Sequence, residues 1–112
     1  MFGFQKLDVY RCAIELLSVV TPLSEKAPKG YAALGDQLRR ASTSIPLNIA
    51  EGSGKFDKDA RRFYAIARGS ALECAAIVDV FKALGFLQPN VHDKLDTLLD
   101  RIVAMLTKMI RE

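Results

Sequence analysis

Several features that would point to a particular class of protein are missing from this sequence. No window approaches the roughly 18 continuous apolar residues that a membrane-spanning helix requires, and the N-terminus MFGFQKLDVYR lacks the apolar stretch of a signal peptide. The two cysteines, Cys12 and Cys74, form no CxxC pair and have no cluster of His or Cys beside them. We therefore expect a cytoplasmic protein without a metal site, a cofactor or a redox pair, in which both cysteines are small buried hydrophobes.

Recognisable catalytic motifs are also absent. His92 is the only histidine, no motif places a Ser or Cys nucleophile beside it, and we expect it on the surface. There is no pair of Glu-x-x-His motifs, which excludes the di-iron type of helical bundle. The segment GSGK at 52–55 is not a phosphate loop, because Ile49 and Phe56 stand where that pattern needs Gly and Ser or Thr. An enzyme is the least favoured function class, and no catalytic residue is predicted.

Helical spacing dominates what the sequence does contain. Apolar residues recur three and four positions apart, and no run of alternating β-branched residues competes with them. Half of the 112 residues are apolar, which is enough for one core, and nothing suggests a second domain. Short connections favour antiparallel neighbours. We predict an all-α protein, an antiparallel up-down-up-down four-helix bundle that forms a single domain over residues 1–112.

The predicted helices and their inward faces follow from capping residues and from the apolar stripes. The helices are expected at about 8–24, at about 33–53, from after Asp57 to 84, and from 89 or 90 to the C-terminus. Asp57 should cap the third helix, Gly52 and Gly54 should stop the second, and Gly85 should end the third. The expected inward residues of the first two helices are Leu7, Tyr10, Ala13, Ile14, Leu17 and Val20, then Leu34, Leu38, Ala41, Ile45, Asn48 and Ile49. Those of the last two are Phe63, Ile66, Ala67, Ser70, Cys74, Ile77, Val78, Phe81 and Leu84, then Val91, Leu95, Leu98, Leu99, Ile102, Met105, Leu106 and Met109.

The middle of the second predicted helix, ASTSIPLNIA at 41–50, contains no charge. At about 100° per residue, Leu38 and Ile45 share one face, and Ser44 and Leu47 lie on a stripe almost opposite. A helix that packs by one face alone should show solvent chemistry on the other. We therefore favour contact with a second copy of the chain, and hence a homo-oligomer, over a monomer.

Pro46 lies inside this helical pattern, where it has no N–H to donate and displaces the carbonyl of Ser42. A kink or break is expected there, and Ser42, Thr43 or Ser44 would bond the freed backbone groups. We favour a kink that lets the helix wrap its neighbours over one that shapes a ligand site.

Two polar residues fall on or beside the inward faces and need partners if they are buried. They are Asn48 of the second helix and Glu73 of the third, and the natural partners are Gln37, Arg39 and Arg40. We favour a polar network that fixes helix register over a catalytic cluster, which would lack a nucleophile or a metal site.

Charge is the remaining functional signal. The net charge of +3 is too small to establish a nucleic-acid partner, but residues 37–68 hold seven cations against three anions. These cations could converge at one end of the second and third helices, because the turn brings the helix ends together. Two interpretations stay open: a solvated face with local ion pairs, or a surface that binds nucleic acid and is repeated in a cyclic assembly. The candidate nucleic-acid-binding residues are Arg39, Arg40, Lys55, Lys58, Arg61, Arg62 and Arg68.

Three segments together carry a family resemblance: FQKLDVYRCAIEL at 4–16, QLRRASTSIPLNIAEG at 37–52 and FYAIARGSALE at 63–73. They closely resemble the four-helix-bundle proteins encoded in intervening sequences of 23S ribosomal RNA genes. The same family includes the accessory variability determinants of diversity-generating retroelements, which look like ring-shaped homopentamers with a basic surface that work with a reverse transcriptase and nucleic acid. The resemblance spans most of the chain and implies a four-helix bundle, a pentamer, and RNA or DNA binding.

The resemblance implies that most of the positions matching the family's motifs are packing and interface positions. The matching positions are Gln37, Leu38, Arg39, Arg40, Ala41, Ser44, Ile45, Pro46, Asn48, Ile49, Glu51, Gly52, Gly69, Ser70 and Glu73. No enzymatic activity comes with the resemblance, and the net charge of +3 is lower than expected of an accessory determinant.

Two functional hypotheses result. The leading one is a non-enzymatic homo-oligomer that binds structured RNA or other nucleic acid by phosphate contacts, without reading sequence. The rival is a scaffold or accessory subunit that binds a protein, such as a reverse transcriptase, and whose arginines form ion pairs with Glu51 and Glu73 of neighbouring subunits.

Overall fold

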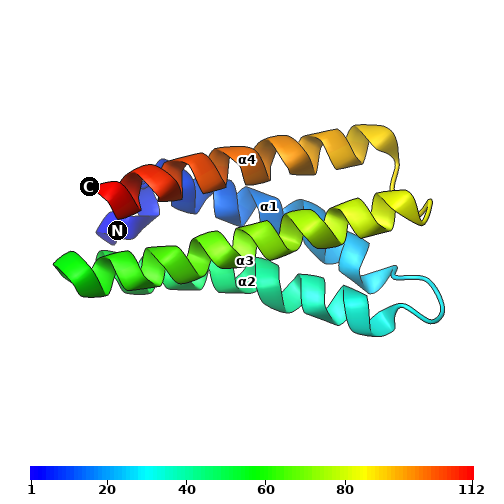
Figure 1. Ribbon diagram of the computed structural model, residues 1–112, viewed down its shortest axis with the longest axis horizontal. Helices are drawn as coiled ribbons and strands as arrows, with labels where there is room; N and C mark the ends of the chain where they lie inside the picture. Colours follow the sequence, from blue (N-terminus) through cyan, green and yellow to red (C-terminus); the bar gives the residue numbers. More distant parts are fainter.

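The helices of the computed structural model, which describes residues 1–112, run side by side as one bundle (Figure 1). A short 3-10 helix, η1 (Gly3–Lys6), precedes α1 (Asp8–Glu25), α2 (Ala32–Ser53), α3 (Asp57–Ala83) and α4 (Pro89–Arg111), and there is no strand. α1 and α3 each pack against both α2 and α4. The prediction of an all-α four-helix bundle is confirmed, and the helix bounds lie within about one residue of those expected; η1 was not predicted.

The core draws buried side chains from all four helices, and that of α4 follows its predicted stripe. Charged and polar residues occupy the rest of this helix, so only one face of α4 can turn toward the core. The predicted α4 residues that are fully buried are Leu95, Leu98, Leu99, Ile102 and Leu106, and those that pack at the edge are Val91, Met105 and Met109.

The predicted inward faces of α1 and α3 are partly wrong. In α1, Val9 and Leu16 are buried, whereas Ile14 is 43 % exposed. Two adjacent stripes of this helix are apolar, so periodicity alone could not select the one that α2 and α4 cover. On α3, Ile66 is exposed because it lies at the margin of the stripe that faces the core, and Leu84 is exposed at the C-cap position beyond the last helical residue.

The helix ends also differ from expectation. Phe56, not Asp57, occupies the N-cap position of α3, no side chain caps the helix, and Asp57 is its first residue with a φ of 50°, in the left-handed region. α2 continues through Gly52, and Gly54 takes the C-cap position. Gly85 follows the end of α3 with a φ of 80°, a conformation that glycine adopts without a steric penalty.

Glycines allow close approach between neighbouring helices. A Cβ on Gly52 would lie 2.7 Å from Tyr64 Cε1 and 3.1 Å from Phe63 Cβ, so α3 passes directly over this position of α2. A Cβ on Gly35 would lie 2.5 Å from the carbonyl oxygen of Ser24, which places the start of α2 against the end of α1. Gly52 is therefore a packing residue, not the stop signal that we expected.

Pro46 does not break α2, which continues helically on both sides of it, and its ring is buried. We expected the hydroxyls near Pro46 to bond the backbone groups that proline leaves unpaired, but they bond a carbonyl oxygen one turn earlier in the helix. Ser42 Oγ and Thr43 Oγ1 both donate to the carbonyl oxygen of Arg39, at 3.0 and 2.7 Å. α2, which packs against both α1 and α3, therefore runs through Pro46 without the break that was one of the two expected outcomes.

Three titratable side chains are buried. His92 is 9 % exposed, contrary to our prediction of a surface residue, because it lies one turn before Leu95 on the core stripe of α4. Its Nε2 lies 2.9 Å from Asp79 Oδ1. Cys12 and Cys74 are buried free cysteines, as predicted. Burial, and to a lesser extent the charge of Glu73, raises the pKa of the Cys74 thiol to about 12.

Candidate nucleic-acid interface

A line of polar contacts joins α2 to α3, and we call its five residues, Gln37, Ser44, Asn48, Ser70 and Glu73, the α2–α3 seam. Ser70 Oγ donates to Ser44 Oγ at 2.9 Å, and Asn48 Nδ2 donates to the same hydroxyl oxygen at 2.9 Å and to the carbonyl oxygen of Ser44 at 2.8 Å. Gln37 Nε2 donates to Glu73 Oε2 at 2.7 Å. The Asn48 bonds lie within α2, whereas the Ser70–Ser44 and Gln37–Glu73 bonds join the two helices and fix their register.

The partners within the seam are only partly those expected. Gln37 does bond Glu73, but Asn48 bonds Ser44 and not an arginine. Arg39 instead donates to Asp36 Oδ1 one turn earlier, at 2.9 Å, with both side chains about half exposed. Such an exposed pair contributes at most about 1 kcal/mol.

Apolar side chains are exposed on both sides of the seam. Leu47, one turn from Ser44 on α2, is 64 % exposed, and Ile66, one turn from Ser70 on α3, is 46 % exposed. Thr43 and Leu47 help to line a shallow hollow of about 450 Å³ on the outer side of α2. The segment 41–50, which itself contains no charge, therefore buries one side within the protomer and exposes the other, where Arg39 and Arg40 line the same hollow.

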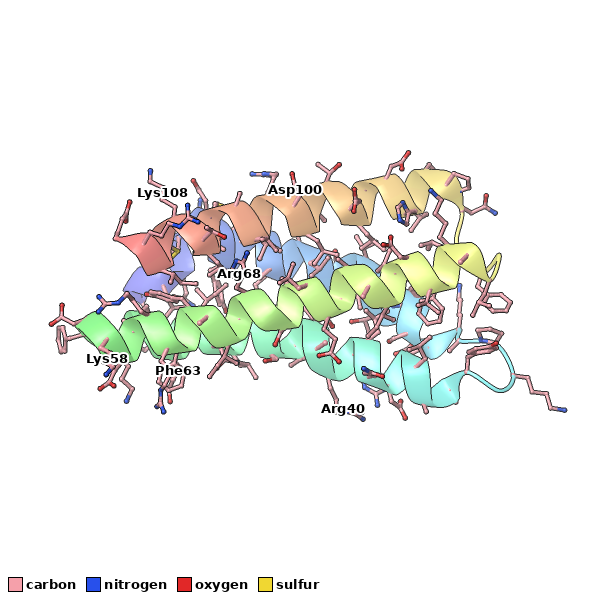
Figure 2. All side chains as sticks on the ribbon, in the orientation of Figure 1. Arg40, Lys58, Phe63, Arg68, Asp100 and Lys108 are labelled. Atoms are coloured by element: carbon pink, nitrogen blue, oxygen red, sulfur yellow. The ribbon has the colours of Figure 1, made fainter.

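Four of the predicted cations, Lys55, Lys58, Arg61 and Arg62, lie together at the turn between α2 and α3, and we call them the turn cations. All four are exposed, and none has a carboxylate oxygen within 4.0 Å. Figure 2 shows Lys58 at this end of the bundle. The guanidinium carbon of Arg62 lies 5.2 Å from the centroid of the Phe63 ring, a cation–π contact.

The seven predicted cations do not converge at one end. Arg39 and Arg40 lie in the first half of α2, and at about 1.5 Å per residue Arg40 is about 20 Å from the end of that helix. Figure 2 shows Arg40 on the outer side of α2, well separated from Lys58. Arg68 points to α4, where its Nε donates to Thr107 Oγ1 at 2.8 Å. The seven predicted cations therefore form three separate groups on the bundle.

The bundle also brings in cations that our sequence reasoning missed. α4 ends beside the start of α3, so Lys108 and Arg111 reach the end of the bundle that carries the turn cations (Figures 1 and 2). The predicted up-down topology already implied this juxtaposition, because it places the last turn of the fourth helix beside the first turn of the third.

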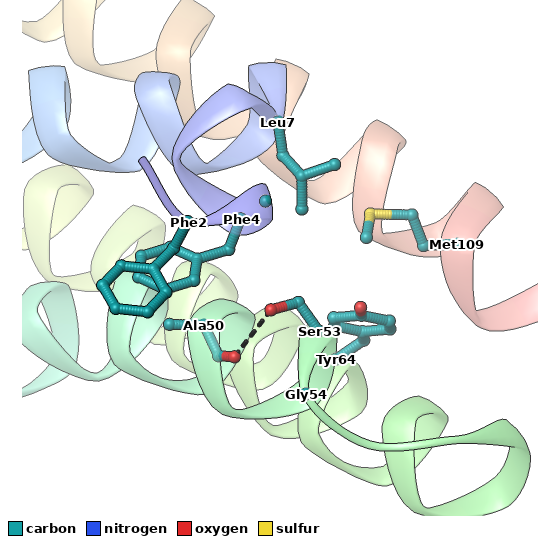
Figure 3. Close-up of a pocket in the computed structure, with 9 residues that line it drawn as sticks. Phe2, Phe4, Leu7, Ala50, Ser53, Gly54, Tyr64 and Met109 are labelled. Carbon is teal, nitrogen blue, oxygen red and sulfur yellow. Dashed lines mark hydrogen bonds between the residues drawn. The ribbon is translucent and has the colours of Figure 1, made fainter.

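An apolar hollow of about 490 Å³ opens at the same end of the bundle (Figure 3). Phe2 and Phe4 of the η1 region, Tyr64 of α3 and Met109 of α4 line it. Burial raises the pKa of the Tyr64 hydroxyl. Sequence reasoning missed this hollow because η1, which supplies one wall, carries no helical periodicity of its own.

The structure has neither a cluster of metal ligands nor a helix that could span a membrane. No group of three or more His, Cys, Asp or Glu side chains is placed to hold a metal ion. No helix combines the length and the apolar character needed to cross a membrane.

Comparison with known proteins identifies a family and a solved structure of similar fold. Residues 5–108 match the model of a family described as 23S rRNA-intervening sequence protein. The chain is also similar to the crystal structure of a protein of unknown function from the S23 ribosomal protein family of Bacteroides thetaiotaomicron VPI-5482, with a TM-score of 0.84 and 18 % sequence identity. That similarity covers 93 % of this chain and 99 % of the other, and it shows the shared fold. No curated protein matches the chain.

Proposed function

The chain belongs to the family of 23S rRNA-intervening sequence proteins, and from that premise we propose that it is a non-enzymatic, cytoplasmic homo-oligomer that binds structured RNA or other nucleic acid. The observation that carries the proposal is the group of four turn cations, which are exposed and without carboxylate partners. Unpaired Lys and Arg side chains are available to phosphates, whose neutralisation releases counterions and supplies most of the affinity in non-specific binding. Binding of this kind positions the nucleic acid without reading its sequence.

Self-association is the second part of the proposal. The exposed Leu47 and Ile66 flank the α2–α3 seam, and the side of α2 between them carries no charge over residues 41–50. Apolar groups in such a position are stabilised when a second copy covers them. The family resemblance implies five subunits. A ring would repeat the turn cations around its axis, so that a weak attraction of each protomer for a polyanion is summed.

The direct test is fluorescence anisotropy of a labelled structured RNA at low salt. We expect Arg61→Glu combined with Arg62→Glu to abolish binding and to leave the helical circular dichroism unchanged, because both side chains are exposed. The matched control is Lys26→Glu with Lys29→Glu, which makes the same change of charge at the opposite end of the bundle. Equal affinity of the two double variants would remove the turn cations from the account.

A scaffold held together by ion pairs between subunits is the alternative. Arg40 and Glu51 favour it, because both are exposed on α2 and neither forms an ion pair within the protomer. If they pair across an interface, Arg40→Glu alone should lower the oligomeric mass, and adding Glu51→Arg should restore it. A mass that neither change affects would eliminate this pair as the link between subunits.

A further inference from the structure

We propose that a hollow between α3 and α4, shared by Arg68 and Arg111, binds a phosphate oxyanion. Five residues line this space of about 360 Å³: Ala65, Arg68, Thr107, Ile110 and Arg111. Figure 2 shows Arg68 between the two helices. The inference deepens the proposed function, on which it rests, by placing one phosphate of a bound strand at a defined position.

Hydrogen bonds hold the guanidinium of Arg68 in one orientation. Thr107 Oγ1 donates to the carbonyl oxygen of Val103 at 2.7 Å, so its hydrogen is used and its lone pairs are free to accept. Arg68 Nε donates to that oxygen at 2.8 Å. No other hydrogen bond is made by this guanidinium, and the two terminal nitrogens keep their four N–H groups available. The side chain is therefore positioned in advance, and its donors are free.

The positive charge of this hollow has no counterpart in the protein. None of the five lining residues is acidic, and neither arginine has a carboxylate oxygen within 4.0 Å. Glu112, the neighbour of Arg111 in the chain, lies 4.0 Å from Lys108 Nζ instead. Arg68 is also partly buried, and a bound anion would replace the hydration that its charge loses there.

The helical spacing brings both arginines to the wall of one hollow. Thr107 and Arg111 are four residues apart on α4, and Ala65 and Arg68 are three apart on α3, so each pair shares one helix face. Ala65 is small and leaves room between the two arginines. Two arginines, one from each helix, match an oxyanion with at least two acceptor oxygens, which a phosphate offers both at the end of a strand and within it.

The first test uses inorganic phosphate as the probe, at constant ionic strength, and follows the phosphorus-31 line width as protein is added. We expect saturable broadening that Arg68→Gln abolishes. Thr107→Val keeps both charges but removes the orienting hydroxyl, and it should weaken binding about tenfold, the effect of losing one charge-assisted hydrogen bond. Arg101→Gln, an exposed arginine of α4 outside the hollow, is the matched control and should bind as wild type does.

Broadening that does not saturate, or that Arg68→Gln leaves unchanged, would overturn the inference. Thermal unfolding of each variant establishes that it is folded at the temperature of the titration. Binding of 5′-phosphorylated and 5′-hydroxyl forms of the same RNA then identifies the source of the phosphate. Loss of affinity in Arg68→Gln for both forms assigns the hollow to an internal phosphodiester, and loss for the first alone assigns it to a terminal phosphate.

The two proposals fail separately. Wild-type RNA binding without saturable phosphate binding overturns the hollow and leaves the proposed function standing. Phosphate binding that depends on Arg68, in a protein that binds no RNA, overturns the proposed function and leaves the phosphate site in the hollow standing. Equal RNA affinity of wild type and Arg68→Gln would overturn the assignment of the hollow to a bound strand.

Discussion

Replacement of Gly52 by alanine should destabilise the bundle, although alanine is the better helix former. The new Cβ would lie 2.7 Å from Tyr64 Cε1, 3.0 Å from Tyr64 Cδ1 and 3.1 Å from Phe63 Cβ, all shorter than ordinary van der Waals contact. The Tyr64 ring can rotate away in part, but Phe63 Cβ is fixed to the backbone of α3. Overpacking of this kind costs about 1–3 kcal/mol, and the helix propensity of alanine offsets about 0.5–1 kcal/mol of it.

The net loss expected for Gly52→Ala is therefore about 0–2.5 kcal/mol in the free energy of unfolding. Gly69→Ala is the matched control, because Gly69 is also inside a helix but has no atom within 4 Å of its added Cβ. Gly69→Ala should raise the free energy of unfolding by about 0.5–1 kcal/mol. Urea unfolding followed by circular dichroism, at one fixed protein concentration because of self-association, measures both. Equal stabilisation of the two variants would refute the close approach of α2 and α3 at Gly52.

Three further predictions concern separate parts of the molecule. Ile66→Glu should lower the oligomeric mass measured by light scattering, whereas Leu72→Glu, equally exposed at 46 % but on the α4 side of α3, should not; the same mass for both would contradict an interface beside the α2–α3 seam. Because the pKa of Cys74 is raised to about 12 in the folded protein, the unfolded chain loses this proton first, so the contribution of Cys74 to stability is intact below about pH 9 and declines as the pH rises from about 9 to 12. Urea unfolding of wild type and Cys74→Ala across this range should show a shallower decline in the variant, and identical slopes would contradict the burial of the thiol. A double-mutant cycle of His92→Ala and Asp79→Ala should give a coupling energy of about 1 kcal/mol or less, since the Asp79 side chain is 71 % exposed; a value of several kcal/mol would show that the pair is shielded from water.

The sequence was sufficient for the fold but not for the rotation of every helix. α4 was predicted correctly because its apolar residues form one stripe between charged ones. α1 was not, since residues on either side of its true inward face are also apolar, and only its packing against α2 and α4 decides between Leu16 and Ile14. His92 was misplaced because its polarity outweighed its position one turn before Leu95.

The candidate site was predictable as a set of residues but not as a surface. Composition identified the seven cations, yet the direction in which each side chain points depends on how its helix is rotated. Arg40 and Arg68 illustrate this: one lies on the outer side of α2, and the other contacts Thr107, which is 39 positions away in the sequence. The register of α3 against α4 creates that contact, and no local pattern encodes it.

Anisotropy of a labelled structured RNA, from low salt to about 0.2 M and with the oligomeric mass measured on the same sample, decides whether the protein is an oligomer whose exposed cations hold nucleic acid. For a duplex RNA we expect an intact oligomer whose affinity falls steeply, by roughly 0.9 log unit per log unit of salt for each phosphate contacted. An intact oligomer that binds no RNA even at low salt would contradict the proposed nucleic-acid binding, and the arginines would then have a structural role.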